Sequence, residues 1–563
     1  MTDGRAETEA AETAAARAPG AAAAAAAPSG RRRWIGLGVL AAALSMIVLD
    51  GTIVGVALPV LIDDLKLDLS QAQWVNGIYS VVFAALLLTA GRLGDRLGRR
   101  RMLVVGVLIF MLGSLLAVLS GSAGALILAR VVQGVGGALI LPTTLSTVNA
   151  TFRGRDRAVA FGVWGAVISG MAAFGPLIGG WLTTAFTWQW IFIVNVPFGV
   201  LVLIGTYLTV AETKTVIRAR GLDVDGLLLS AIGFGALVFA MIEGRTLGWW
   251  ASVADFRIFG WIWPQTAPIS PIPVIGAIGI AAIVLFVLWE RHRGHNGRSA
   301  ILDLKLFAVP TFTWGNLTAL CVAIGEFGLL FVLPLFIVNA MGLTTLGAGF
   351  VLAAMGVGAF FSGSMARHLS ERMGAPNVVL LGLGIEVVGV IATALTLGAH
   401  GSPWLLAALL VFYGLGLGLA SAQLTGTVLR DIPPEQSGQG SATQSTVRQV
   451  GAALGTALIG AVLAIGLAQA VPAQLGTVPG LPPAVSQQLS DSTQLSAGGT
   501  IAPIRAQGDR GTLGASGPAV ASALSNGMAD ASRASLLAAS GFLALGFFFA
   551  LRLRARSRRV LVP

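Results

Sequence analysis

The chain has 563 residues, of which 55% are hydrophobic and 11% are charged, and its formal net charge is +11. A soluble globular protein carries about 25% charged residues, so this chain cannot build an ordinary water-exposed surface. The composition therefore excludes a soluble enzyme, a DNA-binding protein and a disordered scaffold for the whole chain. The mean hydropathy of +0.83 indicates instead a protein whose solvent is the lipid bilayer.

Residues 1–33 are rich in Ala and lack apolar periodicity, which predicts a disordered cytoplasmic tail. Apolar segments of about 20 residues, the length that crosses a bilayer, then recur almost to the end of the chain. These segments predict fourteen membrane spans, at residues 34–59, 73–92, 102–120, 123–148, 158–183, 190–210, 222–243, 273–290, 309–337, 345–367, 377–397, 403–428, 442–467 and 534–552.

Basic residues lie mainly on one set of alternate loops. The loops from Arg92 to Arg101 and from Arg291 to Lys305 are rich in them, whereas the outer loops 184–189 and 338–344 contain no Lys or Arg. This asymmetry is the positive-inside pattern of multi-spanning proteins. It predicts a multi-pass protein of the cell membrane with both termini in the cytoplasm, and it accounts for the positive charge without a nucleic-acid partner.

Two outer loops have unusual compositions. Residues 244–272 are dense in Trp and Phe, which suits the lipid headgroup region and predicts a helix lying in the outer interface. Residues 468–533 are rich in Pro, Gly, Ser and Gln and are too polar to cross the membrane. They predict a long external loop, with short helices near residues 484–497 and 518–532.

A short motif occurs twice, each time after the second span of a group of six. The copies match acid to acid, arginine to arginine and glycine to glycine, at Asp95 and Glu371, Arg96 and Arg372, Gly98 and Gly374. The chain therefore divides into two six-span halves, 34–210 and 309–563, linked by 211–308, which holds two additional spans and the aromatic loop. Duplicated halves are typical of transporters whose binding site lies between the repeats.

The first copy of the motif runs from Gly91 to Arg101. Its glycines allow a tight turn, and Asp95 can cap a helix or pair with an arginine. A loop that served only to orient the chain would need the arginines but no fixed frame of glycines. The motif resembles the signature loop between spans two and three of the major facilitator superfamily. The resemblance implies two gating loops, formed by Gly91, Asp95, Arg96, Gly98 and Arg99 and by Glu371, Arg372 and Gly374.

Two further motifs resemble those of the same superfamily. In the fourth span, Arg130, Gln133 and the glycines of 134–137 are similar to its buried-arginine motif. A proline and small residues in the fifth span resemble the motif of its proton-coupled exporters; they are Gly170, Gly175, Pro176, Gly179 and Gly180. The proline removes a backbone donor, and the small residues allow another helix to approach. Ordinary packing between spans explains a bare Gly-x-x-x-Gly, but explains this longer pattern less well.

Residues 49–59 resemble the first-span motif of the fourteen-span drug–proton antiporter branch, although Gly55 stands where Asn is usual. Residues 188–197 resemble the start of span six in the same branch, with Gln189 where Arg is common. The resemblance implies an all-α protein of two six-helix bundles plus two peripheral helices. It also implies a small hydrophobic substrate, protons as coupling ions, a monomer and no cofactor.

Four charged residues fall inside the predicted spans: Asp50, Arg130, Glu326 and Glu386. A charge at the centre of the bilayer costs at least about 2.5 kcal/mol, so each needs a reason. Counting about 1.5 Å per residue from the cytoplasm places Asp50, Glu326 and Arg130 at one level, roughly 20–25 Å deep. In the superfamily the corresponding spans line the central cavity.

We hypothesise that Asp50, Glu326 or both bind a proton or a cationic substrate, and that Arg130 adjusts the pKa of the acid. The alternative for Asp50 is a static ion pair with Arg130. Glu326 has no basic partner evident in its own half. Glu386 lies in a peripheral span, which favours a residue partnered at a helix interface over a proton carrier. The single Cys and the four His residues suggest no metal site.

The sequence thus favours proton-coupled export of hydrophobic, cationic drugs or natural products by alternating access. A second hypothesis is a dedicated exporter of one endogenous metabolite, antibiotic, lipid or siderophore. A polytopic membrane enzyme would need a catalytic acid, His or metal cluster at the interface, and a sensor would tolerate loss of the intramembrane acids. The absence of a Gly-x-x-x-x-Gly-Lys-Ser/Thr phosphate loop argues against ATP as the energy source.

Overall fold

The computed structural model describes residues 30–152, 154–213, 223–258, 260–296, 298, 300–433 and 436–559. The first half contains α2 Gly30–Leu65, α3 Leu69–Leu97, α4 Arg99–Val118, α5 Ala123–Thr151, α6 Gly154–Ala185, α7 Trp190–Ile193 and α8 Asn195–Thr209. The linking segment contains α9 Val224–Glu243, β1 Phe256–Ile258, β2 Trp261–Trp263 and α10 Pro271–His295.

The second half begins with η1 Leu304–Ala308 and α11 Pro310–Leu335, which continues into the π-helix η2 Phe336–Ala340. It continues with α12 Thr345–Met373, α13 Ala375–Thr396, α14 Pro403–Val428, α15 Ser437–Leu475, α16 Pro483–Leu495, α17 Ile501–Gln507, η4 Gly508–Arg510, η5 Gly514–Ser516 and α18 Gly517–Arg559.

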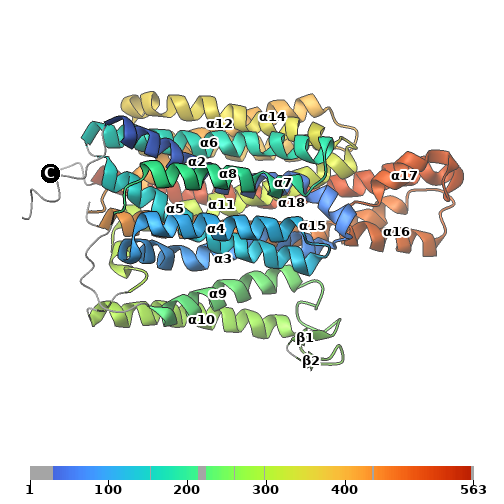
Figure 1. Ribbon diagram of the computed structural model, residues 1–563. Coiled ribbons are helices and arrows are strands. Elements are labelled where there is room, and N and C mark those ends of the chain that lie inside the picture. Colours follow the sequence, from blue (N-terminus) through green and yellow to red (C-terminus); the bar gives the residue numbers. More distant parts are fainter. Residues whose placement is uncertain are drawn as a thin grey trace, which may run out of the picture.

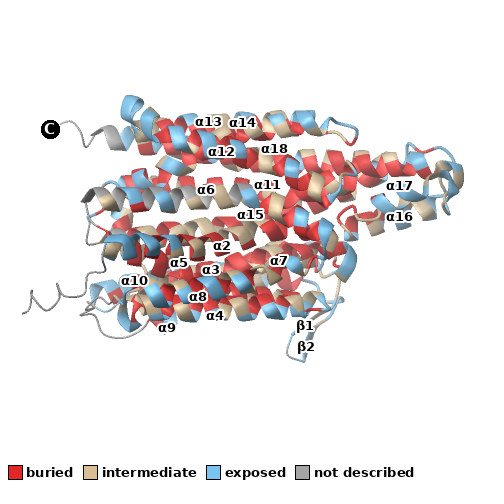
Figure 2. Ribbon diagram, turned by 45° about the horizontal axis from the view of Figure 1, so that its top comes forward, coloured by how far each residue is buried: buried red, intermediate tan, exposed pale blue. Residues whose placement is uncertain are grey.

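The helices form one elongated all-α bundle (Figure 1). Among the described residues, thirteen helical segments are long and apolar enough to cross a membrane, with α7 and α8 counted together. Helix α6, of 32 residues, matches the predicted fifth span and brings the number of membrane helices to fourteen. Buried residues fill the interior of the bundle, and exposed ones lie on its outer helices and at its ends (Figure 2). The all-helical membrane fold expected from the sequence is therefore confirmed.

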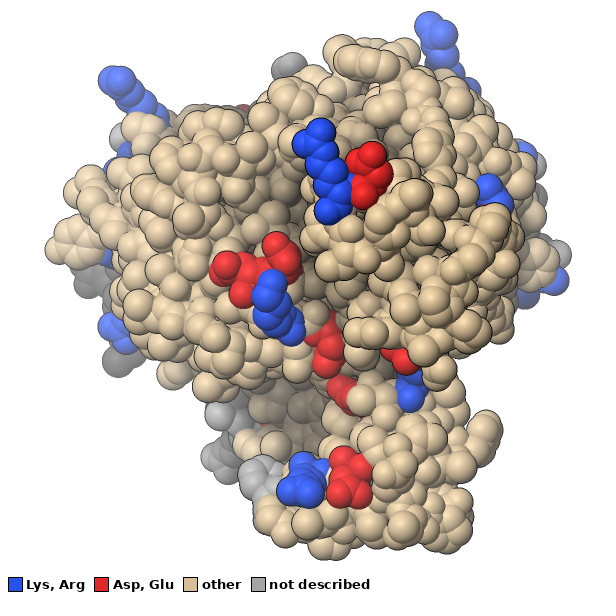
Figure 3. All heavy atoms as spheres, turned by 90° about the vertical axis from the view of Figure 1, so that its right-hand side faces the viewer, with Lys and Arg blue, Asp and Glu red and all other residues tan. Residues whose placement is uncertain are grey.

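The first and last described residues, in α2 and α18, lie at the same end of the bundle, which we call the terminal end (Figure 1). Helices α16 and α17 project from the opposite end, called here the α16 end. Few Lys or Arg side chains are seen at the α16 end, and several of these lie beside Asp or Glu (Figure 3).

Several helices extend well beyond the predicted spans. Helix α2 begins at Gly30, inside the segment expected to be a tail, while residues 1–29 of that tail lie outside the described residues. Helix α15 continues to Leu475, and α18 begins at Gly517, so both enter the predicted external loop. Hydropathy detects only the part of a helix that meets lipid, because the polar extension of the same helix has no apolar signal.

The prediction of an interfacial helix in residues 244–272 is wrong. The aromatic loop instead forms an antiparallel hairpin, in which Phe256 pairs with Trp263 and Ile258 with Trp261. Trp, Phe and Ile favour strands, and Gly260 supplies a positive φ of 83° at the turn. The rings of Trp261 and Trp263 lie 5.4 Å apart. Aromatic composition thus reports the membrane interface but does not distinguish a helix from a hairpin there.

The two additional membrane helices pack beside the boundary between the halves. Helices α9 and α10 lie against each other at one side of the bundle, and α9 contacts both α3 and α15 (Figure 1). Val238 and Ile242 of α9 join a cluster with Val81 of α3 and Ala453 of α15. Near the α16 end, Trp74 Nε1 donates to Glu243 Oε1 at 2.8 Å. This helix pair therefore touches both halves along one flank.

The halves contact each other through α3 with α15, α6 with α12 and α2 with α11. Asn76 Nδ2 donates to Thr456 Oγ1 at 3.3 Å across the first of these boundaries. A Cβ on Gly180 of α6 would lie 2.6 Å from the backbone oxygen of Thr345, the first residue of α12. These two contacts lie toward the α16 end of α3 and α6, so the halves are tightly packed there.

Candidate functional site

Asp50 lies at the centre of a polar network in the first half. Arg130 Nη1 donates to Asp50 Oδ2 at 2.5 Å, and both side chains are at most 1% exposed. The other carboxylate oxygen, Oδ1, accepts hydrogen bonds from Gln133 Nε2 and Asn195 Nδ2, each at 3.0 Å. Every oxygen of this buried carboxylate therefore has a donor, as a stable buried charge requires.

The donors of the network are themselves held in place. Ser114 Oγ accepts from Gln133 Nε2 at 2.9 Å and from Asn195 Nδ2 at 3.2 Å. Arg130 Nε donates to the backbone oxygen of Val75 at 3.3 Å, and the guanidinium lies 4.6 Å from the centre of the Tyr79 ring. The network thus joins α2, α3, α4, α5 and α8. This geometry favours the static ion pair that sequence analysis offers as the alternative for Asp50.

Glu326 has a different environment. It lies on α11, and Arg448 Nη2 of α15 is 3.5 Å from its Oε2 atom. The expectation that Glu326 lacks a basic partner in its own half is therefore wrong. The Glu326 side chain is 11% exposed and that of Arg448 is 38% exposed, so this pair, unlike the one at Asp50, is not fully enclosed by the protein.

Arg448 is the functional candidate that sequence analysis missed. It lies inside the predicted span 442–467, near its start, where it counts as a loop-proximal positive charge. Its position on α15 places it beside α11 only after the helices pack. A signal was present, because any Arg inside a predicted span needs a partner.

The duplicated motif forms two equivalent helix junctions. Gly98, between α3 and α4, has a φ of 113°, and Gly374, between α12 and α13, has a φ of 83°. Both values lie where residues other than glycine are strained. Arg99 donates to Asp95 at 2.8 and 3.0 Å, while in the second half Arg367 pairs with Glu371 at 3.2 Å. The two loops are thus alike in backbone conformation, and each has its acid paired within one helical turn.

Glu212 is a second residue that sequence analysis missed. Its carboxylate lies over Gly98, where a Cβ would be 2.6 Å from it. Its Oε1 atom accepts a hydrogen bond from Arg100 N at 3.1 Å, at the first turn of α4. A negative charge there satisfies an unpaired amide and the helix dipole. Glu212 follows α8, so only tertiary packing brings it to the gating loop.

The glycines of the exporter motif allow three close helix contacts. Gly175 and Gly179 of α6 pack on Thr52 and Ile53 of α2, and a Cβ at Gly179 would lie 3.1 Å from the Ile53 oxygen. The backbone oxygen of Pro176 faces Gly349 of α12 at 2.6 Å from the position of a Cβ. A Cβ at Gly170, in contrast, would meet no atom within 4 Å. Four of the five motif residues therefore lie where α6 packs on another helix. Two of these four, Pro176 and Gly180, contact α12 of the other half.

Replacing Gly180 with alanine is expected to open the α16 end. The new Cβ would meet a backbone oxygen at 2.6 Å, and overpacking of this kind costs about 1–3 kcal/mol. To measure this, a cysteine is placed at Thr345 in a Cys321→Ser background. We expect this cysteine to react with a maleimide about tenfold faster when Gly180 is replaced with alanine than when Gly180 is present. The matched control is Gly541→Ala in α18, where a Cβ has open space. Equal labelling rates in both variants would contradict this assignment.

Glu386, in the middle of α13, has no hydrogen-bond partner among the described residues. The residue is 0% exposed, and neither carboxylate oxygen is bonded. The interpretation of Glu386 as a residue partnered at a helix interface is therefore wrong: it lies at such an interface but is unpaired. The position of Glu386 in a peripheral span indicates the helix interface, but it does not show whether a hydrogen-bond donor reaches the carboxylate.

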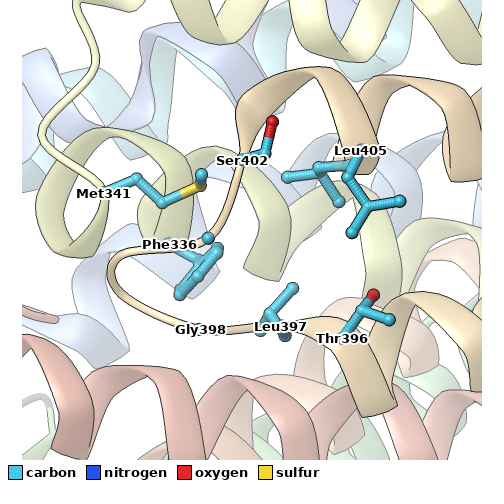
Figure 4. A pocket seen from close by; sticks show the side chains of 9 residues that line it. Phe336, Met341, Thr396, Leu397, Gly398, Ser402 and Leu405 are labelled. Carbon is cyan, nitrogen blue, oxygen red and sulfur yellow. The ribbon is translucent and has the colours of Figure 1, made fainter.

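A small cavity lies near the α16 end, and the described residues include no candidate metal site. Within the described ranges, no group of three His, Cys, Asp or Glu side chains could hold a metal ion. The cavity lies between η2 and the turn from α13 to α14, where Phe336 and Met341 face Leu397 and Leu405 (Figure 4). Its lining has no charged side chain, so it differs from the Glu326 region.

Comparison with known proteins agrees with this architecture. Residues 40–456 match the model of the Major Facilitator Superfamily. The riboflavin transporter RibZ of Clostridioides difficile (strain 630) is 30% identical over 437 residues, covering 78% of this chain and 90% of that protein. The puromycin resistance protein pur8 of Streptomyces alboniger is 33% identical over 454 residues, covering 80% and 85%. Other relatives are named as multidrug or antibiotic resistance proteins.

A solved structure has the same fold. It is a bacterial homolog of the human lysosomal transporter Spinster in an inward-facing and unoccupied conformation. It is 18% identical, covers 94% of this chain and 98% of its own, and has a TM-score of 0.59. The family model covers most of the chain. The chain thus belongs to the drug-efflux branch of the major facilitator superfamily and is a membrane transporter, not an enzyme.

Proposed function

We propose that this transporter exports hydrophobic, cationic small molecules in exchange for protons, and that Glu326 is the coupling carboxyl. The observation that carries the proposal is the Glu326–Arg448 pair. Its carboxylate is largely buried, and its guanidinium is partly exposed. A carboxylate in this position is stable only when it is protonated or paired with a cation. A cationic substrate and a proton therefore compete for one group, which links their movements in opposite directions.

The packing of the halves supports a direction for this exchange. The halves are tightly packed at the α16 end, and Arg448 is nevertheless exposed. We propose that water reaches Arg448 from the terminal end, and that this end faces the cytoplasm. Both termini would then lie on the cytoplasmic side of the cell membrane. The protein would then work as a monomer whose halves rock about the 91–101 and 367–374 loops.

Asp50 and Arg130 have a supporting role in this proposal. Their network is fully satisfied and is not reached by solvent, so a proton or substrate cannot enter without separating several helices. We propose that the pair holds the first half together as one moving body. A direct role of Asp50 in proton binding requires that Arg130 leave it during the cycle, and transport by the double variant Asp50→Asn, Arg130→Gln tests this.

The decisive experiment is transport of ethidium into inside-out membrane vesicles that contain the protein. We expect uptake when the vesicle interior is acidified, and its loss when a protonophore is added. Vesicles from cells without the protein are the control. Uptake that continues with the protonophore and requires ATP would refute proton coupling.

A dedicated exporter of one natural product is the second candidate function. The names of the relatives favour it, because a riboflavin transporter and a puromycin resistance protein each concern one compound. Competition against ethidium uptake separates the two candidates. Inhibition by several unrelated cations supports broad specificity, whereas inhibition by a single compound class supports a dedicated exporter.

A further inference from the structure

Glu386 and Tyr413 are two buried polar residues that the proposed coupling at Glu326 does not use. Glu386 on α13 and Tyr413 on α14 are both 0% exposed. Neither the two carboxyl oxygens of Glu386 nor the hydroxyl of Tyr413 has a hydrogen-bond partner among the described residues. A carboxylate left ionised in such a place would bear the full cost of burying an unpaired charge.

The two halves of the protein allow a direct comparison of this interface. In the first half, α4 and α5 approach closely at Gly106, Gly113 and Gly136: a Cβ on Gly136 would lie 2.5 Å from Phe110 N, and one on Gly113 2.6 Å from Gln133 N.

In the second half, α13 and α14 approach in the same way at Gly382, Gly389 and Gly416. A Cβ on Gly416 would lie 2.6 Å from Glu386 N, and one on Gly389 would lie 2.9 Å from Tyr413 Cα. The spacings along both helices are the same as in the first half.

This correspondence places Glu386 where the first half has Phe110, and Tyr413 where it has Gln133. Phe110 is fully buried and apolar, so the helix contact by itself needs no polar group at this position. The second half instead holds a carboxyl there, without any hydrogen bond to offset its desolvation. An ionisable group that packing does not require and that no donor satisfies points to a role in the transport cycle.

The charged groups around Glu386 come from several helices. Glu326 of α11 and Arg448 of α15 are near enough to act on it electrostatically, and Glu386 acts in turn on Tyr413. Helices α14, α18 and α12 pack on α13. Arg533 of α18 donates to Leu397 O at 2.9 Å and pairs with Asp530, so these two charges lie level with the end of α13 rather than with its middle, where Glu386 lies. The remaining described charges of these two helices include Arg552 of α18 and Arg367 and Glu371 of α12, which lie near the helix ends. Among the described residues, the positive charge that acts on Glu386 is Arg448, which also pairs with Glu326.

We infer that Glu386 is a second proton-binding site of this transporter, occupied by a proton in the conformation described here. Its carboxyl is neutral while the α13–α14 contact is closed. When the second half rearranges, the O–H bond breaks, the proton passes to water and the carboxylate remains until it is reprotonated from the opposite side. The exchange part of this inference rests on the proposed proton-coupled function, whereas the occupancy of the site does not.

Infrared spectroscopy of the purified protein tests the occupancy directly. We expect a carbonyl stretch of a protonated carboxylic acid at neutral pH that shifts in D₂O and is lost in Glu386→Gln. Glu386→Phe, which copies Phe110, should lose the same band and guards against a folding defect of the first variant. Glu326→Gln and the exposed Asp509→Asn should retain the band. If the band remains in both Glu386 variants, the inference is wrong.

A proton count in reconstituted vesicles tests the exchange. Ethidium accumulation at equilibrium under a fixed pH gradient gives the number of protons exchanged for each molecule. We expect this number to fall by about one in Glu386→Gln, while transport remains driven by protons through Glu326. An unchanged number, with the infrared band lost, would refute exchange at Glu386. Absence of proton-driven transport in the unmodified protein would refute the proposed function instead, and the infrared result would still decide occupancy.

Discussion

Replacing Arg130 with alanine is expected to destabilise the folded protein strongly. Asp50 would remain buried with only the two amide donors of Gln133 and Asn195. Breaking a buried ion pair by removing one partner typically costs about 3–5 kcal/mol, because an uncompensated charge is left behind. We expect a clearly lower thermal unfolding temperature in detergent, together with reduced yield of monodisperse protein.

A double substitution provides the control for this prediction. Asp50→Asn combined with Arg130→Gln removes both charges and keeps polar side chains of similar size. We expect the double variant to be more stable than either single variant, because it leaves no unpaired buried charge. Additive losses of stability would show that the two residues are not coupled. A stable double variant that has lost proton-driven transport would instead show that Asp50 takes part in proton binding.

Replacing Glu326 with glutamine is expected to abolish proton-driven transport while the protein stays folded. Its partner Arg448 is 38% exposed, so solvent compensates the charge that loses its partner. Partly exposed ion pairs contribute only about 0–1 kcal/mol to stability, which predicts a small change in the unfolding temperature. The measurement is ethidium uptake under an imposed pH gradient, where we expect a loss of at least about tenfold, equivalent to 1.4 kcal/mol.

The matched variants for Glu326 separate charge from packing. Glu326→Asp keeps the carboxyl and should retain part of the transport, because only its reach toward Arg448 is shortened. Arg448→Gln keeps the coupling carboxyl but removes its resting partner, so we expect the pH dependence of transport to shift while transport persists. Full proton-driven transport by Glu326→Gln would exclude this residue as the coupling group.

The two ion pairs have different surroundings, although the sequence presents their acids as similar. Both acids lie in the first span of their half and at similar depth. The Asp50 carboxylate accepts hydrogen bonds from three donors on two other helices, α5 and α8, whereas the Glu326 pair has a single long contact and is partly exposed. A buried polar group whose hydrogen bonds are all made stabilises the structure. A buried group with only some of its hydrogen bonds made can change its protonation or its partner more easily.

The sequence by itself determined the membrane class, the spans and the duplication of the halves. These properties depend on composition and on the order of residues along one helix, because lipid selects apolar segments of sufficient length. The junctions at Gly98 and Gly374 were also predictable, since the turns use local glycine conformations.

Only the tertiary structure decided which buried groups have partners. Arg448 reaches Glu326 across 122 residues of sequence, and Glu212 reaches the first gating loop from the end of another helix. Glu386 has no donor in the part of the chain that the structure describes. The hairpin in the aromatic loop and the polar extensions of α15 and α18 were likewise hidden, because hydropathy does not report their geometry. Pairing depends on the rotation and depth of helices from distant parts of the chain, which no local pattern encodes.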